Sequence, residues 1–338
     1  DVAPSRGLGD VYKRQVYMCT LKETKNKFLQ NILKIYLKTR RKLKMRKKVL
    51  AVVSALVITT LAFTGCGNNK SASSDNGSDS GAKSQAITVV SREEGSGTRG
   101  AFVELLGVVD ENENDITVSS AQITNSTSVM LQKVAQTKSA IGYVSLGSLS
   151  TDVKAVQVDG VDATAENVKS GDYKVSRPFN ICYKEDKLSD IDKDFISFIM
   201  SKEGQQIVND NGYIGVEATE SYKASGKKGK ITLAGSTSVA PLMDKLKDEY
   251  VKLNADASIE IQESGSSAGI QSAIEGATEI GMSSRELKDE EAKELQVQKI
   301  ALDGIAVIVN TENQVTNLTS DQIKKIYTGD LTDWADVQ

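Results

Sequence analysis

The chain has 338 residues and contains no histidine, so its length allows two domains and histidine-based acid–base or metal chemistry is excluded. Its charge is unevenly distributed: residues 1–65 hold 15 Lys and Arg against 3 Asp and Glu, a balance of +12, which leaves −15 on the remainder. An acidic body argues against nucleic acid as a partner.

A secretion signal is predicted near the N-terminus. The basic stretch Met45–Lys48 precedes the apolar run Val49–Phe63, which ends in Phe63-Thr-Gly-Cys66. Small residues before a cysteine resemble the lipobox of bacterial lipoproteins, although Phe63 stands where leucine is more usual. A transmembrane helix is the alternative, but the run is short for one. We therefore expect a lipoprotein signal peptide over 45–65.

This interpretation assigns the rest of the N-terminal region. Residues 1–44 are interpreted as spurious or upstream translation, and Cys66 as the lipid-modified first residue of the mature protein. Residues 66–85 are rich in Ser, Asn, Gly and Asp and predict a flexible tether. Cys182 is then the one other cysteine of the mature chain, so no disulfide is expected there. It is predicted to be a buried small apolar residue.

Strands and helices alternate along the body, which predicts an α/β fold with mainly parallel sheets. A polar stretch at 217–230 is interpreted as a linker. Strands are expected at 86–90, 140–145, 154–158, 177–183, 258–262 and 300–309, the last interrupted at Asp303-Gly304. Helices are expected at 101–106, 189–200, 202–208 and 319–327, and after the loops described next.

Four loops between a strand and a helix are rich in hydroxyl side chains. They lie at 91–100, 235–238, 263–269 and 279–286. Backbone N–H groups at a helix start, ringed by hydroxyls, form a neutral site for an anion, although ordinary helix capping is the simpler alternative. A similar Asn-Ser-Thr-Ser run occupies 125–128. Because ligands of such sheets bind beyond the carboxyl ends of the strands, all four loops can face one crevice.

Several motifs together resemble the phosphate-binding protein of bacterial ABC phosphate uptake. The resemblance covers Ala86–Gln338 and rests on Ser91-Arg-Glu-Glu-Gly-Ser-Gly-Thr98, Ser176-Arg-Pro-Phe179, Gly235-Ser-Thr-Ser238, Gly265-Ser-Ser-Ala-Gly269, Ile280-Gly-Met-Ser-Ser-Arg-Glu-Leu287, Ala301-Leu-Asp-Gly-Ile-Ala-Val307 and Ile326-Tyr-Thr-Gly329 with Trp334.

The resemblance implies a two-lobed type II periplasmic-binding-protein fold with two crossover strands, near 175–185 and 301–310. Lobe A would comprise 86–177 plus 307–338, and lobe B 178–306. The two halves stand in exchanged order relative to the usual family order. This suggests a circular permutation between ends that lie close in space. A truncated tandem protein is the alternative.

The resemblance also implies a set of ligand-binding residues. They are Arg92, Ser96, Gly97, Thr98, Thr237, Ser238, Ser266 and Ser284. Arg92 would supply the one cation, with planar geometry suited to an oxyanion. Ser284 stands where some family members have an aspartate that rejects sulfate. Glu94 matches an acidic residue that pairs with the arginine, or is simply exposed. Arg285 is left outside the site.

The implied function is an extracytoplasmic lipoprotein, anchored to the bacterial cell membrane by its lipid. It would capture inorganic phosphate between the lobes and deliver it to the permease subunits of an ABC importer. We expect a monomer without cofactor or metal. Binding of another oxyanion such as sulfate, or a surface sensor or adhesin role, is the alternative. A hydrolase is disfavoured, because no Gly-Lys-Ser/Thr follows Gly95-Ser-Gly-Thr98 and the hydroxyls lack a general base.

Overall fold

The computed structural model describes residues 84–337. The predicted signal peptide, the lipidation site Cys66 and nearly all of the tether lie outside the described residues. Within 84–337, no helix is both long and apolar enough to cross a membrane.

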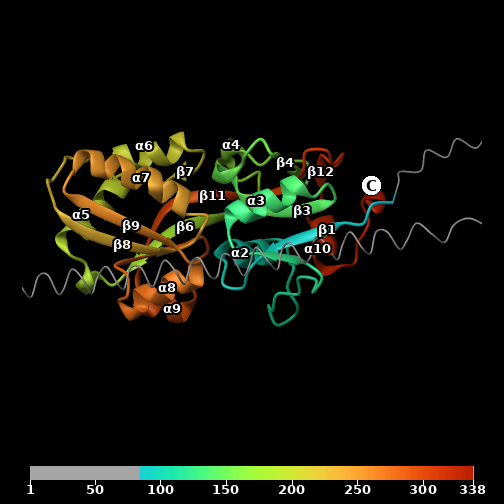
Figure 1. Cartoon of the computed structure of the whole chain (residues 1–338), viewed down its shortest axis with the longest axis horizontal. Helices are drawn as coiled ribbons and strands as arrows, with labels where there is room; N and C mark the ends of the chain where they lie inside the picture. Colours follow the sequence, from blue (N-terminus) through green and yellow to red (C-terminus); the bar gives the residue numbers. More distant parts are fainter. Residues whose placement is uncertain (1–83, 338) are drawn as a thin grey trace, which may run out of the picture. The chain divides into compact units, whose positions relative to one another are not determined.

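A ten-stranded mixed sheet runs through the described part of the chain (Figure 1). Two of its strands, β4 (Val153–Ala155) and β7 (Ile214–Gly215), pair only with β11. A separate two-stranded sheet joins β5 (Gln157–Val158) to β12 (Asn317–Leu318). The other eight strands follow the order β2 (Gln122–Thr124), β1 (Thr88–Arg92), β3 (Ala140–Ser145), β11 (Gln296–Asn310), β6 (Ser176–Tyr183), β10 (Ile280–Ser283), β8 (Gly229–Gly235) and β9 (Ala257–Glu263).

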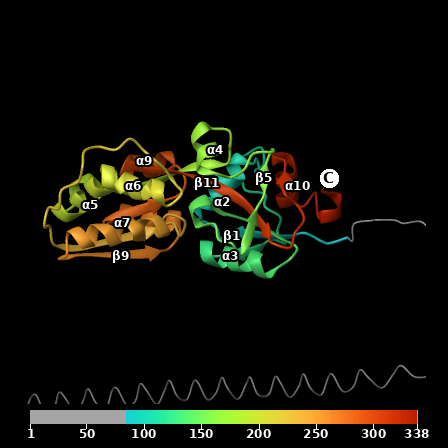
Figure 2. The same ribbon diagram turned by 90° about the horizontal axis from the view of Figure 1, so that it is seen from above.

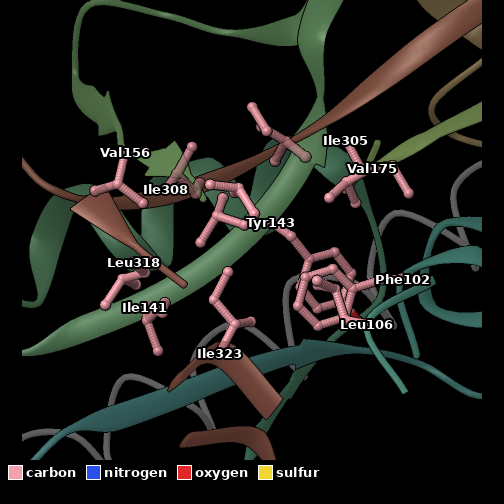
Figure 3. Packing of buried hydrophobic residues seen from close by; sticks show 14 of the residues in the cluster. Phe102, Leu106, Ile141, Tyr143, Val156, Val175, Ile305, Ile308, Leu318 and Ile323 are labelled. Atoms are coloured by element: carbon pink, nitrogen blue, oxygen red, sulfur yellow. The ribbon is translucent and has the colours of Figure 1, made fainter. Parts of the chain in front are cut away.

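Two large hydrophobic clusters divide these elements into two lobes. We call lobe A the elements around the cluster that includes Phe102, Tyr143, Val175 and Ile305. Figure 3 shows this cluster, in which the rings of Phe102 and Tyr143 stack 3.9 Å apart. Its helices are α2 (Gly97–Leu105), α3 (Thr127–Gln136), α4 (Ala165–Ser170) and α10 (Ser320–Thr328), with the short 3-10 turns η1 (Leu146–Ser148) and η3 (Trp334–Asp336).

Lobe B surrounds the second cluster, which includes Phe179, Phe195, Tyr250 and Ala301. Cys182 is fully buried in lobe B, as predicted, and burial raises the pKa of its thiol to about 12. Figure 2 shows α5, α6, α7 and β9 grouped away from α2, α3 and α10 of lobe A. The helices of lobe B are α5 (Asp190–Met200), α6 (Lys202–Asp210), α7 (Ala240–Leu253), α8 (Ser266–Glu275) and α9 (Asp289–Glu294), with the 3-10 turn η2 (Glu185–Lys187).

The spacing of apolar residues explains how α7 packs. Leu242, Met243, Leu246 and Tyr250 recur three or four positions apart and are all fully buried, so one face of the helix covers the sheet. Pro241 lies in the first turn, where its missing N–H costs no helical hydrogen bond. Each of these large side chains contributes about 1.5–3 kcal/mol by leaving water.

Two strands, β6 and β11, connect the lobes and pair with each other in antiparallel fashion. Parallel pairing was predicted and holds within each lobe, for β1 with β2 and β3, and for β8 with β9 and β10. The predicted interruption at Asp303-Gly304 is wrong, because β11 continues unbroken through both residues. A strand can carry this aspartate because Arg177, its direct partner on β6, neutralises it.

The stretch predicted as a linker is fixed to lobe B. Asp194 Oδ2 accepts hydrogen bonds from the hydroxyls of Tyr222 and Tyr250, each at 2.7 Å. Further along, Gly226 N donates to Asn254 Oδ1 at 3.1 Å. These bonds tie the connection between the two halves of the sequence to α5 and α7.

The first described residues lie beside the last ones. Ile87 N donates to Thr332 O at 2.8 Å, and Trp334 N donates to Gln85 O at 3.0 Å. Ala86 and Asp333 form an antiparallel bridge between these two contacts. Segments almost 250 positions apart in sequence are therefore neighbours in the fold.

Candidate functional site

The candidate site is formed where four helices begin between the lobes. In lobe A, β1 leads into α2 and β2 leads into α3; in lobe B, β8 leads into α7 and β9 into α8. Each helix start carries a hydroxyl side chain and offers N–H groups with partial positive charge. The loops follow the carboxyl ends of parallel strands, which brings them to one edge of each lobe.

Direct hydrogen bonds join the lobes at this site. Arg92 Nη2 donates to Thr237 Oγ1 at 2.9 Å, and the hydroxyls of Thr98 and Ser238 are 2.8 Å apart. Thr127 Oγ1 lies 3.2 Å from both Thr237 Oγ1 and Ser238 Oγ, and Thr127 N donates to Thr237 Oγ1 at 3.3 Å. All five residues are at least 95% buried, so these polar groups interact away from bulk water.

Three further hydroxyls of lobe B lie beside this set. Ser236 Oγ donates to Ser284 Oγ at 2.9 Å, and the hydroxyls of Ser266 and Ser284 are 3.4 Å apart. Gly97 of lobe A faces them so closely that a Cβ atom there would lie 2.3 Å from Ser266 Oγ and 2.7 Å from Ser284 Oγ. Gly97 is thus required by the close approach of the lobes.

The side chain of Arg92 is held by Glu93. Nε donates to Oε2 and Nη2 to Oε1, both at 2.8 Å, while the arginine is only 2% exposed. Glu94 is exposed, which was one of the two alternatives expected for it, and the adjacent Glu93 pairs with the arginine. The bidentate pair occupies one edge of the guanidinium and leaves Nη1 and one N–H of Nη2 pointing at Thr127 and Thr237.

The backbone of Arg92 is held as firmly as its side chain. Its N–H donates to Tyr143 Oη at 3.1 Å, and its carbonyl accepts from Arg99 Nη1 at 2.9 Å. Burial raises the pKa of Tyr143, so the hydroxyl remains neutral and available as an acceptor. The cation of the site is therefore held in place by groups of its own lobe.

The structure brings most of the predicted site residues together. Ser96 is used differently, because its hydroxyl caps α2 by accepting from Arg99 N at 3.4 Å. Thr127 and Ser236 belong to the cluster but were not predicted. The Asn-Ser-Thr-Ser run at 125–128 was the available signal for Thr127, since it repeats the pattern of the other loops. The residues brought together are Arg92, Gly97, Thr98, Thr237, Ser238, Ser266 and Ser284.

Arg285 stays within lobe B. It forms an ion pair with Glu291 at 2.8 Å and donates from Nη2 to Ser267 Oγ at 3.2 Å. Ser267 N also donates to Gly95 O at 3.1 Å, which is a backbone contact between the lobes. Arg285 thereby supports this contact between the lobes through Ser267.

The chemistry of this arrangement favours binding of an oxyanion. Hydroxyls and helix-start N–H groups supply many donors without net charge, and Arg92 adds a single cation. The hydroxyls described above hydrogen-bond to one another and to the arginine, a pattern suited to holding a group with several acceptor oxygens.

Fold and site together define a class, that of two-lobed α/β solute-binding proteins of the type II periplasmic-binding-protein fold. The chain matches the model of a PBP superfamily domain over residues 68–203 and 220–338. The chain belongs to this superfamily.

The individual relatives show which members of the superfamily this chain resembles in sequence and structure. A protein of Streptococcus agalactiae called phosphate-binding protein PstS 2 is 49% identical over 294 residues, which are 86% of this chain and 97% of that protein. The crystal structure of a phosphate-binding protein of a phosphate ABC transporter from Streptococcus pneumoniae is 46% identical, with a TM-score of 0.62; the match covers 75% of this chain and all of that one. A Staphylococcus haemolyticus PstS is 39% identical over 118 residues, 32% of this chain and 37% of its own length.

Proposed function

We propose that this protein captures inorganic phosphate between its lobes and delivers it to an ABC importer. The observation that carries the proposal is the buried cluster of hydroxyls and helix starts around Arg92. Hydrogen bonds to a charged ligand contribute about 1.5–3 kcal/mol each, so a handful gives the roughly −8 kcal/mol of micromolar binding. The streptococcal relatives, which are named as phosphate-binding proteins, support phosphate as the ligand.

Neutral donors explain how an acidic protein can hold an anion. Glu93 already balances the charge of Arg92, so the remaining attraction comes from dipoles fixed at short range. The proposed contacts are Arg92, Ser96, Gly97, Thr98, Thr237, Ser238, Ser266 and Ser284, to which Thr127 and Ser236 are added from the geometry. The proposed role is binding and not catalysis.

Calorimetric titration of the full chain with phosphate, and separately with sulfate, tests this function. Micromolar, saturable binding of phosphate is expected. Ser284 offers a hydroxyl oxygen that can accept a hydrogen bond from the P–OH group of phosphate, but it rejects sulfate less strictly than a carboxylate does, because the hydroxyl can also donate. Saturable binding of sulfate without phosphate binding would favour the other-oxyanion alternative. Binding of neither anion would favour a sensor or adhesin.

We also propose that the protein works at the outer face of the cell membrane, anchored through Cys66. The basic stretch, the apolar run and the small residues before the cysteine support this. Replacing Cys66 with alanine should move the protein from the membrane fraction to the soluble fraction after cell lysis. Unchanged membrane association of Cys66→Ala would contradict the anchor.

The order of the two halves is proposed to be a circular permutation, in a monomer with lobe A at 86–177 plus 307–338 and lobe B at 178–306. Ile305 and Ala306, which these bounds place in lobe B, pack in the cluster of lobe A, so the boundary on β11 lies before Ile305. The bridge between Ala86 and Asp333 supports it, because ends joined in another order must lie close together. One alignment covers 97% of the S. agalactiae relative, which supports the same order there, whereas the S. haemolyticus relative matches over about a third.

A further inference from the structure

A buried ion pair lies midway between the two hydrophobic clusters. Arg177 on β6 and Asp303 on β11 are direct partners in the antiparallel register, and Nη2 lies 3.1 Å from Oδ2. Both side chains are 1% exposed. Their neighbours two positions away belong to opposite lobes: Val175 and Ile305 pack in lobe A, and Phe179 and Ala301 pack in lobe B. The pair therefore marks the point where the connecting strands pass from one lobe to the other.

Both lobes contact this pair. From lobe A, Ser145 Oγ donates to Asp303 Oδ1 at 2.8 Å. From lobe B, the ring of Phe179 lies under the Arg177 guanidinium, 5.4 Å away, and packs against the ring of Tyr213. Gly147 of lobe A meets that tyrosine ring so closely that a Cβ atom there would lie 2.2 Å from Cζ. Any rotation of one lobe against the other must pass through this packed region.

A buried charge constrains such a rotation. Separating a buried pair leaves an uncompensated charge away from water and is strongly unfavourable. Movements that keep Arg177 beside Asp303 are therefore favoured over movements that pull the two apart. Because the pair joins β6 to β11 where both strands pass from one lobe to the other, a rotation about an axis through the pair preserves it.

We propose that Arg177 and Asp303 act as positioning residues that define the hinge axis and thereby the geometry in which the lobes close on ligand. The inference rests on the proposed phosphate function for its assay. Loss of the pair allows additional arrangements of the lobes, so the binding-competent fraction falls and the apparent dissociation constant rises by the same factor.

The charged state of Asp303 allows a test by pH. A hinge that depends on this charge makes the effect of Asp303→Asn on binding change with pH, whereas a purely structural role does not. Burial raises the pKa of Asp303 to about 6, against the opposing effect of Arg177. The other groups facing it are the Ser145 hydroxyl, the Gly147 backbone N–H, and Tyr173 and Tyr213, whose hydroxyls burial keeps neutral by raising their pKa. Below about pH 6, Asp303 of the parent is mostly protonated and therefore uncharged. The side chain at this position is uncharged at every pH in Asp303→Asn.

The experiment compares phosphate dissociation constants of Asp303→Asn and the parent, in the full chain, by calorimetry. At about pH 7.5 the variant should bind roughly tenfold more weakly, within the usual range of coupling between sites. At about pH 5 the ratio should fall below about twofold, because the parent is then protonated as well. Titration of phosphate itself cancels in the ratio. Asp192→Asn is the matched control, since Asp192 is an equally buried carboxyl that caps α5, and its ratio should stay near one.

Parent-like binding of folded Asp303→Asn at the higher pH, or a ratio that does not change with pH, would overturn the hinge role. If Asp303→Asn does not fold, Ser145→Ala is measured in its place. This variant removes one hydrogen bond to Asp303 and keeps the ion pair between Arg177 and Asp303. It should weaken binding about two- to fivefold at about pH 7.5, because losing one hydrogen bond to the Asp303 carboxylate affects the hinge less than losing its charge, and parent-like binding would overturn the proposal. A parent that binds no phosphate would instead contradict the proposed function.

Discussion

The two lobes face each other with different chemistry. Lobe A brings the charge, as Arg92 paired with Glu93, and holds it through Tyr143 and Arg99. Lobe B brings neutral hydroxyls, five of them buried, on Ser236, Thr237, Ser238, Ser266 and Ser284. Because Glu93 balances the charge of Arg92, both lobes act on an anion only at short range, lobe A through the directed N–H groups of the guanidinium and lobe B through neutral hydroxyls. We therefore expect affinity to depend more on Arg92, whose hydrogen bonds are charge-assisted, than on any single hydroxyl of lobe B.

The largest loss is expected from lobe A. Removing one partner of a buried charged contact costs about 2–5 kcal/mol, so Arg92→Ala should weaken phosphate binding by at least tens-fold in calorimetric titration. Arg92→Lys should recover only part of the affinity, because an ammonium lacks the planar fork. Lys138→Ala, which removes an exposed positive charge from the same lobe, is the control and should bind as the parent does. Parent-like affinity of Arg92→Ala would refute the site assignment.

A smaller but still large effect is expected where the lobes touch. The methyl group of Gly97→Ala would collide with Ser266 and Ser284, and overpacking costs about 1–3 kcal/mol, which corresponds to roughly 5- to 150-fold weaker binding. Gly100→Ala lies in the same helix with its nearest neighbour, Arg285 Cδ, at an ordinary 3.7 Å, and should leave affinity unchanged. Equal affinities for the two variants would show that the lobes do not close this tightly on ligand.

The smallest losses should come from single hydroxyls. Thr127→Val keeps the shape of the side chain and removes one buried donor, so phosphate binding should weaken about two- to tenfold. Thr237→Val and Ser266→Ala should behave similarly, each below the loss for Arg92→Ala. Ser128→Ala is the control for Thr127→Val, because Ser128 is the next residue of α3 and is exposed. An effect of Ser128→Ala as large as that of Thr127→Val would place the loss in α3 rather than at the site.

Local patterns allowed much of this site to be predicted. A strand followed by glycine, serine and threonine and then a helix is a short-range signal, and it identified loops that meet between the lobes. The individual ligand-binding residues were implied by the resemblance to phosphate-binding proteins and stay a prediction. What the sequence did not settle depends on exact loop geometry. The turn at Gly95 directs Glu93, and not Glu94, toward Arg92. Thr127 was missed because its role depends on contact with the other lobe.

In the fold, too, features that depend on nearby residues were predicted, and a feature that depends on a distant residue was not. The strands and the buried face of α7 followed from the spacing of apolar residues. The interruption predicted in β11 was wrong because Asp303 and Gly304 resemble a break when read alone. Only the facing strand supplies Arg177, which lies 126 positions away and makes the aspartate acceptable in a buried strand.

The contact between Ala86 and Asp333 means that the two halves of the chain can be connected in either order. Connecting these neighbours directly and cutting the surface connection near Tyr222 would exchange the order of the halves without moving any residue of the cleft. The binding chemistry depends on where the loops meet in space, and each loop remains attached to its own strand and helix under either connectivity. The order of the two halves can therefore change in evolution while the contacts between the binding loops are kept. The same freedom allows new termini to be placed where a reporter is to be fused.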